Sequence, residues 1–277
     1  MQVDLVVVGY LLHDIIEISG KRREALGGPA AYTSLAASLL GLKVGIVTKV
    51  GKDFKYWDQL DLPVRAGEQE RTTCFLNIYQ DGRRRQEVRW VGEKIGIKDF
   101  PEEWLSARFI HLGPVISEID PKLVKWLSER AEGRIILDPQ GFMREARDGR
   151  VEKTGLDFSL LDWVDLVKVS EDDLEDEAGF IRECEKRDKT LIITRGERGS
   201  EILWPFRQRI PAWKFPVRDP TGAGDVYVAG LVYGLLKGYS LEKSCRFASA
   251  LASYSVSIQG PLHSLQGFDP EKIEAEL

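Results

Sequence analysis

Short apolar runs alternate with helical patterns from the first residues of the chain onward. The run Val3–Val8 is apolar and mostly β-branched apart from Asp4, and it is ended by a glycine, which is typical of a strand buried in a parallel sheet. Gly27 and Gly28 precede an Ala- and Leu-rich segment, Pro29–Leu40, which predicts a helix. A second apolar run, Lys43–Thr48, follows at once. The opening of the chain therefore predicts a strand–helix–strand unit whose first strand is central.

Further apolar runs of strand length recur along the chain, separated by segments with helical periodicity. They are Phe109–Leu112, Arg134–Leu137, Leu166–Val169 and Leu191–Thr194. Strands that alternate with helices favour a doubly wound, mostly parallel sheet flanked by helices. In the last third, helices are expected over Ala223–Lys237 and Leu241–Ile258, with a short one from Pro270. Because no linker, repeat or low-complexity tract interrupts the pattern, residues 1–277 are expected to form a single α/β domain.

One stretch breaks this rhythm, because its residues alternate as they do in antiparallel strands. Thr72–Tyr79 and Arg84–Trp90 both alternate, and residues 80–83 supply turn chemistry between them. The pattern predicts a β-hairpin. Together with the segment after the first strand, the hairpin is expected to form a small β-sheet lid. This lid would consist of residues of about 10–26 and 64–94. The pattern fits a hairpin that merely lies on the surface equally well.

Composition and charge narrow the classes of partner. The chain is 43% hydrophobic and 30% charged, as an ordinary globular protein is. Its net charge of −5 argues against nucleic acid or an anionic membrane as the main partner, while a local basic pocket for phosphate stays open. No basic segment precedes the first apolar run, and no stretch approaches the roughly 20 apolar residues of a membrane span. We therefore expect a cytoplasmic protein that acts on small molecules.

The cysteines and histidines give no sign of a disulfide framework or a zinc site. Cys74, Cys184 and Cys245 are far apart and form no CxxC pair, which is typical of reduced cytosolic thiols. The three histidines show neither an HExxH motif nor any other ligand spacing. Among them, His111 at a strand end is expected to be a structural histidine with satisfied hydrogen bonds.

The segment with the strongest chemical signal is DPTGAGD, residues 219–225, which leads directly into an apolar helix. Gly222, Ala223 and Gly224 leave the backbone uncovered, so their N–H groups can converge on an anion at the positive end of the helix dipole. An acid would repel a resting phosphate there, so Asp225 makes chemical sense as a base that takes a proton from a substrate hydroxyl. The alternative is a tight turn followed by a favourable first-turn acid. Because neither a Walker A motif nor GxGxxG occurs, any phosphate site must be built in this other way.

This heptapeptide resembles the second signature of the ribokinase, or PfkB, family of carbohydrate kinases, and further blocks follow in the order of that family. Those blocks are Gly9 and Asp14, similar to the opening sugar-binding element; the diglycine Gly27–Gly28; Gly51 and Asp53; Thr194, Gly196 and Gly199, similar to the nucleotide-binding turn; and Ser257–Pro261, at the place of the last adenine-pocket loop. The resemblance spans nearly the whole chain. It implies a ribokinase-like α/β fold with a small β-sheet lid.

The resemblance also implies an activity and a set of site residues. The chain would transfer the terminal phosphoryl group of ATP, with Mg²⁺ as cofactor, to a hydroxyl of a sugar or cyclic polyol. Asp225 would be the general base, and Gly222, Ala223 and Gly224 would form the anion hole. The residues implied to bind substrate are Asp14, Gly27, Gly28, Tyr32, Asp138, Gln140 and Arg144. Those implied to bind nucleotide are Lys168, Ser170, Thr194, Gly196, Gly199, Thr221, Gly222 and Gly224.

Two positions depart from the family pattern. The Asn-x-x-Glu element, which organises Mg²⁺ in the family, corresponds here to Ser170–Asp173, so the Asn is missing and Asp173 remains for an indirect metal contact. Without the resemblance, this run reads equally as a helix start with Ser170 as its N-cap. The family Asn that contacts sugar is Tyr32 here, whose ring is expected to pack on a ring-shaped substrate or in the core.

Three further segments are similar to the inositol kinases within the family. They are RTTCFLNIY from Arg71, HLGPV from His111 and LDPQGFMR from Leu137. By this similarity Asp138, Gln140 and Arg144 line or support the acceptor pocket, and myo-inositol is the favoured acceptor. Read alone, Asp138 is also an ordinary residue at a strand end. Guanidinium groups can bind phosphate through two hydrogen bonds, and four of them lie around the hairpin, at Arg71, Arg83, Arg84 and Arg85. Such side chains are more often solvated.

Several alternatives stay open on the sequence. A ribokinase, nucleoside kinase or sugar-acid kinase of the same family would show the same motifs, and GTP or ADP could replace ATP as donor. A sensor that binds a sugar or nucleotide without transferring phosphate is the alternative from another class, but it would not need the acid at position 225. The protein is expected to be a monomer or a homodimer, with the hairpin as a candidate contact.

Overall fold

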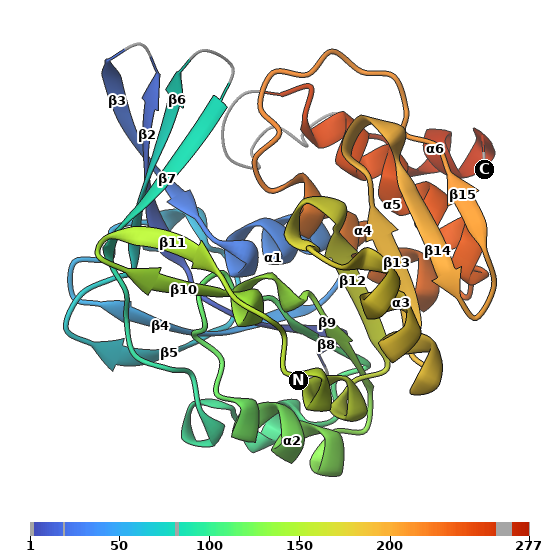
Figure 1. Cartoon of the computed structure of the whole chain (residues 1–277), viewed down its shortest axis with the longest axis horizontal. Coiled ribbons are helices and arrows are strands. Elements are labelled where there is room, and N and C mark those ends of the chain that lie inside the picture. The colour runs from blue at the N-terminus through green and yellow to red at the C-terminus, as the bar shows by residue number, and fades with distance from the viewer. Residues whose placement is uncertain (1–2, 19, 81–82, 259–267, 277) are drawn as a thin grey trace.

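The computed structural model describes residues 3–18, 20–80, 83–258 and 268–276 (Figure 1). Within these residues it contains two β-sheets. The strands of the larger one, in spatial order, are β15 (Gln208–Ile210), β14 (Ser200–Trp204), β13 (Thr190–Thr194), β12 (Leu166–Ser170), β9 (Arg134–Leu137), β8 (Phe109–Leu112), β1 (Leu5–Val8), β4 (Val44–Gly51) and β5 (Val64–Gln69). The strands from β13 to β5 run parallel, while β14 and β15 extend the sheet antiparallel to their neighbours.

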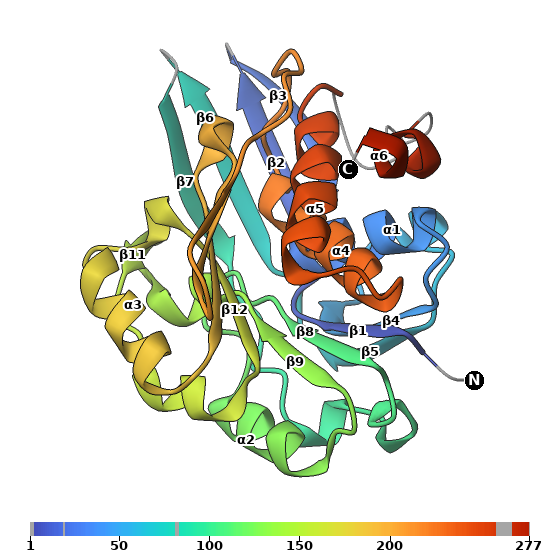
Figure 2. The ribbon, with the colours of Figure 1, turned by 90° about the vertical axis from the view of Figure 1, so that its right-hand side faces the viewer.

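Helices cover both faces of the larger sheet, as the alternation of strands and helices in the sequence predicts. The helices are α1 (Pro29–Leu39), α2 (Pro121–Arg130), α3 (Glu177–Lys186), α4 (Ala223–Leu236), α5 (Leu241–Ser255) and α6 (Pro270–Glu276). Figure 2 shows α1, α4 and α5 on one side of this sheet and α2 and α3 on the other. The short 3₁₀ turns are η1 (Trp57–Gln59), η2 (Ile97–Asp99), η3 (Glu102–Trp104), η4 (Pro139–Met143), η5 (Phe158–Trp163), η6 (Glu171–Asp173) and η7 (Gly196–Arg198).

Strand β1 shows why a continuous apolar run suits this position. Leu5 and Val7 point into the core beneath α1, α4 and α5, whereas Val6 and Val8 point into the core beneath α2 and α3. Because successive side chains of a strand face opposite ways, a strand with a core on each side needs apolar residues at every position. β1 lies between β4 and β8 but two strands from one edge, so it is interior without being central.

The smaller sheet contains the predicted hairpin. Its strands, in spatial order, are β10 (Arg144–Arg147), β11 (Arg150–Lys153), β7 (Arg83–Trp90), β6 (Cys74–Gln80), β2 (Leu12–Ile18) and β3 (Lys21–Gly27). Strands β6 and β7 form the hairpin. It pairs with the segment that follows β1, since β2 lies beside β6 and runs parallel to it. The turn at residues 81–82 lies outside the described residues.

The boundaries expected for the lid need two corrections. β5 falls inside the expected range 64–94, yet it pairs with β4 at the edge of the larger sheet. Conversely, β10 and β11 join the smaller sheet through β7, although no pattern in the sequence predicts them. Both differences arise from pairing between distant segments, which local alternation does not specify. In the part of the chain that the structure describes, no helix has the length and apolarity to cross a membrane.

Candidate active site

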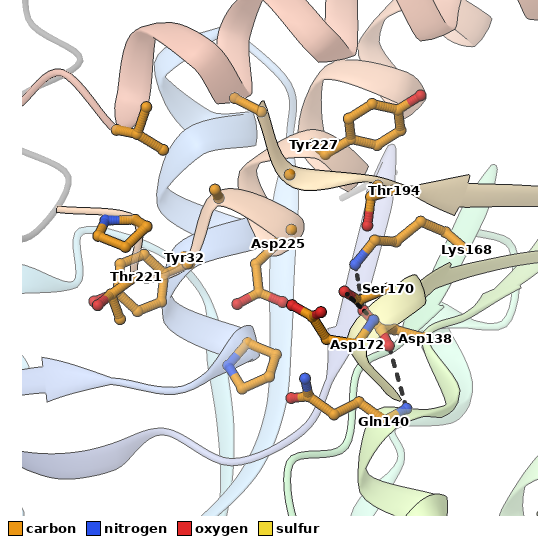
Figure 3. Close-up of a pocket in the computed structure, with 18 of the residues that line it drawn as sticks. Tyr32, Asp138, Gln140, Lys168, Ser170, Asp172, Thr194, Thr221, Asp225 and Tyr227 are labelled. Atoms are coloured by element: carbon orange, nitrogen blue, oxygen red, sulfur yellow. Dashed lines mark hydrogen bonds and ion pairs between the residues drawn. The ribbon is translucent and has the colours of Figure 1, made fainter. Parts of the chain in front are cut away.

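A cavity of about 1050 Å³ opens where the carboxyl ends of the parallel strands meet the smaller sheet and the start of α4 (Figure 3). Ligands of open α/β sheets bind at this edge, because loops diverge there and leave a crevice. Among the residues implied to be catalytic or to bind substrate, nucleotide or metal, all except Gly27 line the cavity: Asp14, Gly28, Tyr32, Asp138, Gln140, Arg144, Lys168, Ser170, Asp173, Thr194, Gly196, Gly199, Thr221, Gly222, Ala223, Gly224 and Asp225. Segments far apart in sequence are therefore gathered at one place.

The start of α4 presents bare backbone amides to this cavity. Gly222 is the N-cap, in the left-handed region at φ 77°, and no side chain caps the helix. The N–H groups of Gly222 and Gly224 have no hydrogen-bond partner among the described residues, whereas that of Ala223 lies 3.4 Å from the carbonyl of Pro220. Unpaired amides at the positive end of a helix dipole favour an anion. Two of the three predicted amides are thus available.

Asp225 projects from the first turn of α4 into the cavity (Figure 3). Burial raises the pKa of its carboxyl to about 7, while Lys168 acts in the opposite direction and Asp138 in the same one. The carbonyl of Asp225 accepts a hydrogen bond of 3.1 Å from the hydroxyl of Thr33 in α1. A carboxyl group with a pKa near neutrality, beside an anion site, is suited to accept a proton at physiological pH.

A buried ion pair lies next to this carboxyl group. Lys168 Nζ donates to Asp138 Oδ2 at 2.6 Å, and both side chains are almost fully buried. A Cβ atom on Gly224 would lie 2.8 Å from Lys168 Nζ, so the ammonium group touches the first turn of α4. The pKa of Lys168 is raised: burial acts to lower it, but Asp138 and Asp225 outweigh burial. A positive charge is therefore fixed beside Gly224, one of the two residues with a free amide.

The diglycine brings Asp14 and the start of α1 close together. A Cβ on Gly27 would lie 2.1 Å from Asp14 Oδ2, and one on Gly28 would lie 2.2 Å from the carbonyl of Tyr10. Gly28 also has φ 100°, which side chains other than hydrogen rarely allow. Gly27 therefore does not line the cavity, but its missing side chain leaves room for the carboxylate of Asp14. Asp14 itself is buried at the cavity wall.

Tyr32 packs directly against the turn at the start of α4. A Cβ on Gly222 would lie 2.3 Å from Tyr32 Cδ1, so the ring packs against the N-cap glycine. Burial raises the pKa of the Tyr32 hydroxyl, and the carboxylates of Asp14, Asp219 and Asp225 raise it further. The ring, expected to pack on a ring-shaped substrate or in the core, packs against this turn and against the core beneath α1, α4 and α5, while a contact with substrate stays a prediction.

The loop after β9 is tied to the loop after β12. Gln140 Nε2 and Arg144 Nη2 donate to the two oxygens of Asp173 at 3.2 and 2.5 Å. Ser170 is the N-cap of η6 and accepts from the N–H of Asp172 at 3.3 Å. Both the family-based and the purely structural interpretation of Ser170 are compatible with this geometry, because Ser170 also lines the cavity.

These carboxylates do not fit a Mg²⁺ ion held directly by protein. Both oxygens of Asp173 are engaged by Gln140 and Arg144, and Asp138 is paired with Lys168. Within the described ranges, no group of three or more His, Cys, Asp or Glu side chains is placed to hold a metal ion. A Mg²⁺ ion that enters with a nucleotide would be held by phosphate oxygens and water.

The turn between β13 and β14 is held by a clamp that the sequence did not indicate. Gly196 and Gly199 adopt φ 55° and 92°, as a tight turn requires. The guanidinium of Arg195 donates to Glu177 at 2.5 and 2.6 Å and also to Glu171 and Glu201. Arg195 therefore anchors the turn to three other segments. The role of Arg195 could not be predicted from the sequence, because only the fold brings its three glutamate partners together.

Another part of the cavity wall is mostly apolar and aromatic. Its side chains are Trp213, Phe215, Val217, Ala252 and Val256, with the polar Lys214, Ser249 and Ser253 among them. A flat heterocyclic base would bury its faces against such a surface. Of the segment Ser257–Pro261, expected to form the last adenine-pocket loop, residues 259–261 lie outside the described residues.

Other predicted residues lie away from the chemistry. The guanidinium of Arg71 lies 5.7 Å from the Trp90 ring, and Arg85 pairs with Glu87. The side chains of Arg83 and Arg84 are not among the described parts of the chain. His111 is fully buried, but neither ring nitrogen has a partner among the described groups, so the expectation of a satisfied histidine is wrong.

A buried acid that sequence reasoning missed supports the floor of the cavity. Glu118 is 1% exposed and accepts from the N–H groups of Val115 and Ile116 at 2.7 to 2.8 Å and from that of Tyr10 at 3.3 Å. It thereby links the end of β1 to the loop after β8, where Val115 lines the cavity. Burial raises the pKa of this carboxyl group.

Comparison with known proteins identifies the family of this chain. Residues 3–266 match the profile of the pfkB family carbohydrate kinases, and the chain belongs to that family. It is therefore a phosphotransferase with an alcohol group as acceptor, a sugar, nucleoside or polyol kinase. The ribokinase-like expectation drawn from the sequence motifs is confirmed.

The relatives of this chain are named for different acceptor substrates. The chain is 31% identical to a cytidine kinase of Thermococcus kodakarensis over 88% of this chain and 92% of the relative. It is 26% identical to an inositol 3-kinase of Arabidopsis thaliana over 91% of this chain and 73% of that one. Its fold is similar to that of a pyrophosphate-dependent kinase in the ribokinase family complexed with a pyrophosphate analog and myo-inositol, with a TM-score of 0.80, 22% identity, and coverage of 98% and 99%.

Proposed function

We propose that this chain transfers the terminal phosphoryl group of ATP to a hydroxyl of a cyclic polyol, with myo-inositol as the preferred acceptor and Asp225 as the general base. The observation that carries the proposal is the position of the Asp225 carboxyl group, in the cavity and beside the free amides of Gly222 and Gly224. Kinases of this family generally use ATP with Mg²⁺. The proposed cytoplasmic location suits a kinase that draws on ATP.

The proposed reaction is an in-line displacement. The oxygen of the acceptor hydroxyl forms a bond to the terminal phosphorus as the bond from that phosphorus to the bridging oxygen breaks, and ADP leaves with the bond electrons. The hydroxyl proton passes to Asp225. The amides of Gly222 and Gly224 stabilise the charge on the migrating phosphoryl oxygens, and the Lys168 ammonium adds a positive charge nearby.

The two ends of the cavity divide the ligands. The acceptor is proposed to lie between the smaller sheet, where Asp14 faces the cavity, and the loop of Asp138 and Gln140. The nucleotide base is proposed to lie at the apolar end, near Trp213 and Phe215. The smaller sheet, as the lid of one α/β domain, would then exclude water, which would otherwise compete with the acceptor.

A specific observation supports a second candidate acceptor. The cytidine kinase relative is more similar in sequence, at 31%, than the inositol 3-kinase relative, at 26%. A nucleoside such as cytidine would place its sugar hydroxyl at Asp225 by the same chemistry. The reaction type is common to both candidates, and only the acceptor differs.

An acceptor screen tests the proposal. Purified protein is assayed for phosphorylated product with Mg²⁺ and either ATP, GTP, ADP or pyrophosphate, against myo-inositol, ribose, cytidine and a sugar acid. We expect the highest kcat/KM for myo-inositol with ATP. Cytidine as the best acceptor would replace the inositol assignment, and no product from any pair would overturn the proposed function.

A further inference from the structure

One face of the smaller sheet is directed toward the cavity. It carries a diagonal row of polar side chains with apolar side chains on either side. Side chains alternate along a strand, and the register pairs Asp14 with Phe75 and Asn77 with Gln86. The residues of this face are Leu12, Asp14, Ile16, Phe75, Asn77, Gln86 and Val88. Of the polar residues, Asp14 and Gln86 line the cavity, and Asn77 lies buried between them at 2% exposure.

Hydrogen bonds give this diagonal a fixed direction. Asn77 Nδ2 donates to Asp14 Oδ1 at 2.8 Å, and Gln86 Nε2 donates to Asn77 Oδ1 at 3.0 Å. Asp14 as a carboxylate can only accept, so Asn77 must turn its amide nitrogen toward it. Asn77 then offers only its oxygen to Gln86. Gln86 must therefore use its nitrogen in the sheet and keep its carbonyl oxygen, Oε1, for another partner.

No described residue donates to Gln86 Oε1. The residue is only partly buried and lines the cavity, so we expect this oxygen to be within reach of a ligand. A sheet face packs without such a network, since buried polar groups stabilise little and cost free energy when unpaired. The arrangement instead holds two acceptor groups, Asp14 and Gln86, at the lid end of the cavity.

We infer that Gln86 is a specificity-determining residue, which with Asp14 selects an uncharged acceptor that offers hydrogen-bond donors to the lid. This inference rests on the proposed kinase function. Two acceptor groups match two donors on the ligand, and the negative charge of Asp14 disfavours an anionic acceptor such as a sugar acid. The matching donors are adjacent hydroxyls of a cyclic polyol or the hydroxyl and amine groups of a nucleoside.

The first experiment replaces the amide by an apolar side chain of similar size. Gln86→Leu should raise the KM for the acceptor about 10-fold, the effect of one lost hydrogen bond, and leave the Kd for ATP unchanged. Glu87→Gln is the matched control, because Glu87 lies on the opposite face of β7, where it pairs with Arg85 and Arg89. The control variant should behave as the wild type.

Acceptor analogues separate a specific contact from a loosened lid. Deoxy analogues of myo-inositol, each lacking one hydroxyl, are compared on wild type and Gln86→Leu. On the wild type, kcat/KM for at least one deoxy analogue should be about 10-fold lower than for myo-inositol. On Gln86→Leu, the same analogue and myo-inositol should have almost the same kcat/KM. A general loosening of the sheet by the substitution would instead lower kcat/KM of the variant for myo-inositol and for every analogue by the same factor, so that the ranking of analogues would be the same on both proteins. With cytidine as substrate, base-modified analogues lacking the amine serve as the same test.

The outcomes distinguish the inference from the proposed function. If the wild type phosphorylates an acceptor but Gln86→Leu retains the same KM and the same ranking of analogues, Gln86 has no part in specificity and the inference is overturned. If a sugar acid is the best acceptor of the wild type, the inference also fails. If the wild type phosphorylates nothing in the screen, it is the proposed function that fails.

Discussion

At the scale of single residues, Asp225 should titrate in the range where activity is measured. Burial raises the pKa of its carboxyl to about 7, and the base must be ionised to accept a proton. We therefore expect kcat/KM for the acceptor to rise with pH up to an apparent pKa of about 7 and then to level off. A profile that is flat between about pH 5.5 and 8.5 would contradict this role.

The titration of Asp225 can be separated from that of the nucleotide. Lys168 acts to lower the pKa of Asp225, so Lys168→Gln should move the acid limb of the profile to higher pH. Titration of the free nucleotide would leave the limb at the same pH in wild type and variant. Fluorescence-based measurement of nucleotide affinity at each pH serves as the control.

Residues in contiguous motifs could be predicted from the sequence, because their geometry is local. Gly222 and Asp225 belong to one helix start, where backbone amides and a first-turn acid necessarily lie together. Asn77, Gln86 and Arg195 could not be predicted in the same way. Their partners come from other strands, and only the register of the sheets shows that the side chains meet.

At the scale of elements, the turn into α4 requires glycine at position 222 for two reasons. Its φ of 77° disfavours any side chain, and a Cβ would lie 2.3 Å from the Tyr32 ring. Gly222→Ala should therefore lower kcat about 10- to 100-fold, because one amide of the anion hole is displaced. It should also reduce the free energy of unfolding by about 1–3 kcal/mol.

Gly238 offers a matched control at the other end of the same helix. It has φ 81°, but a Cβ there would meet no atom within 4 Å. Gly238→Ala should reduce the free energy of unfolding by about 1–2 kcal/mol, as backbone strain alone does, and leave kcat unchanged. Equal loss of activity in both variants would show that strain, and not the anion hole, limits the rate.

The elements themselves were predicted well where periodicity was strong. The strands β8 and β9 have the bounds that the apolar runs suggested, and α4 begins at the expected residue. The prediction failed for β5 and for β10 and β11, which are short or mostly exposed and therefore carry little hydrophobic pattern. Membership of a sheet depends on distant pairing, so residue patterns alone could not assign it.

At the scale of the whole molecule, one buried histidine links stability to pH. Burial lowers the pKa of His111 from its ordinary 6.5 to about 3. The unfolded chain then binds a proton that the folded chain does not, so stability present above pH 6.5 is lost as pH falls toward 3. Between pH 7.5 and pH 5 this group should cost the fold about 2 kcal/mol.

His111→Leu removes this term. We expect the loss of unfolding free energy between pH 7.5 and pH 5, measured by urea denaturation, to be about 2 kcal/mol smaller in the variant than in the wild type. The wild type and the variant must be compared at both pH values, because the removal of an unpaired imidazole also changes stability independently of pH. Identical pH dependence in the two proteins would mean that His111 is protonated, or hydrogen-bonded, in the folded state.

The most direct measurement of the central claim compares turnover and nucleotide binding in Asp225→Asn. The amide keeps the size of the side chain but cannot accept the proton of the acceptor hydroxyl. We expect kcat to fall by about 10²- to 10⁴-fold, while the Kd for ATP, measured by calorimetry, stays within about threefold of the wild-type value. A variant that turns over at the normal rate would contradict the assignment of Asp225 as the base, and so would one whose only defect is loss of ATP binding.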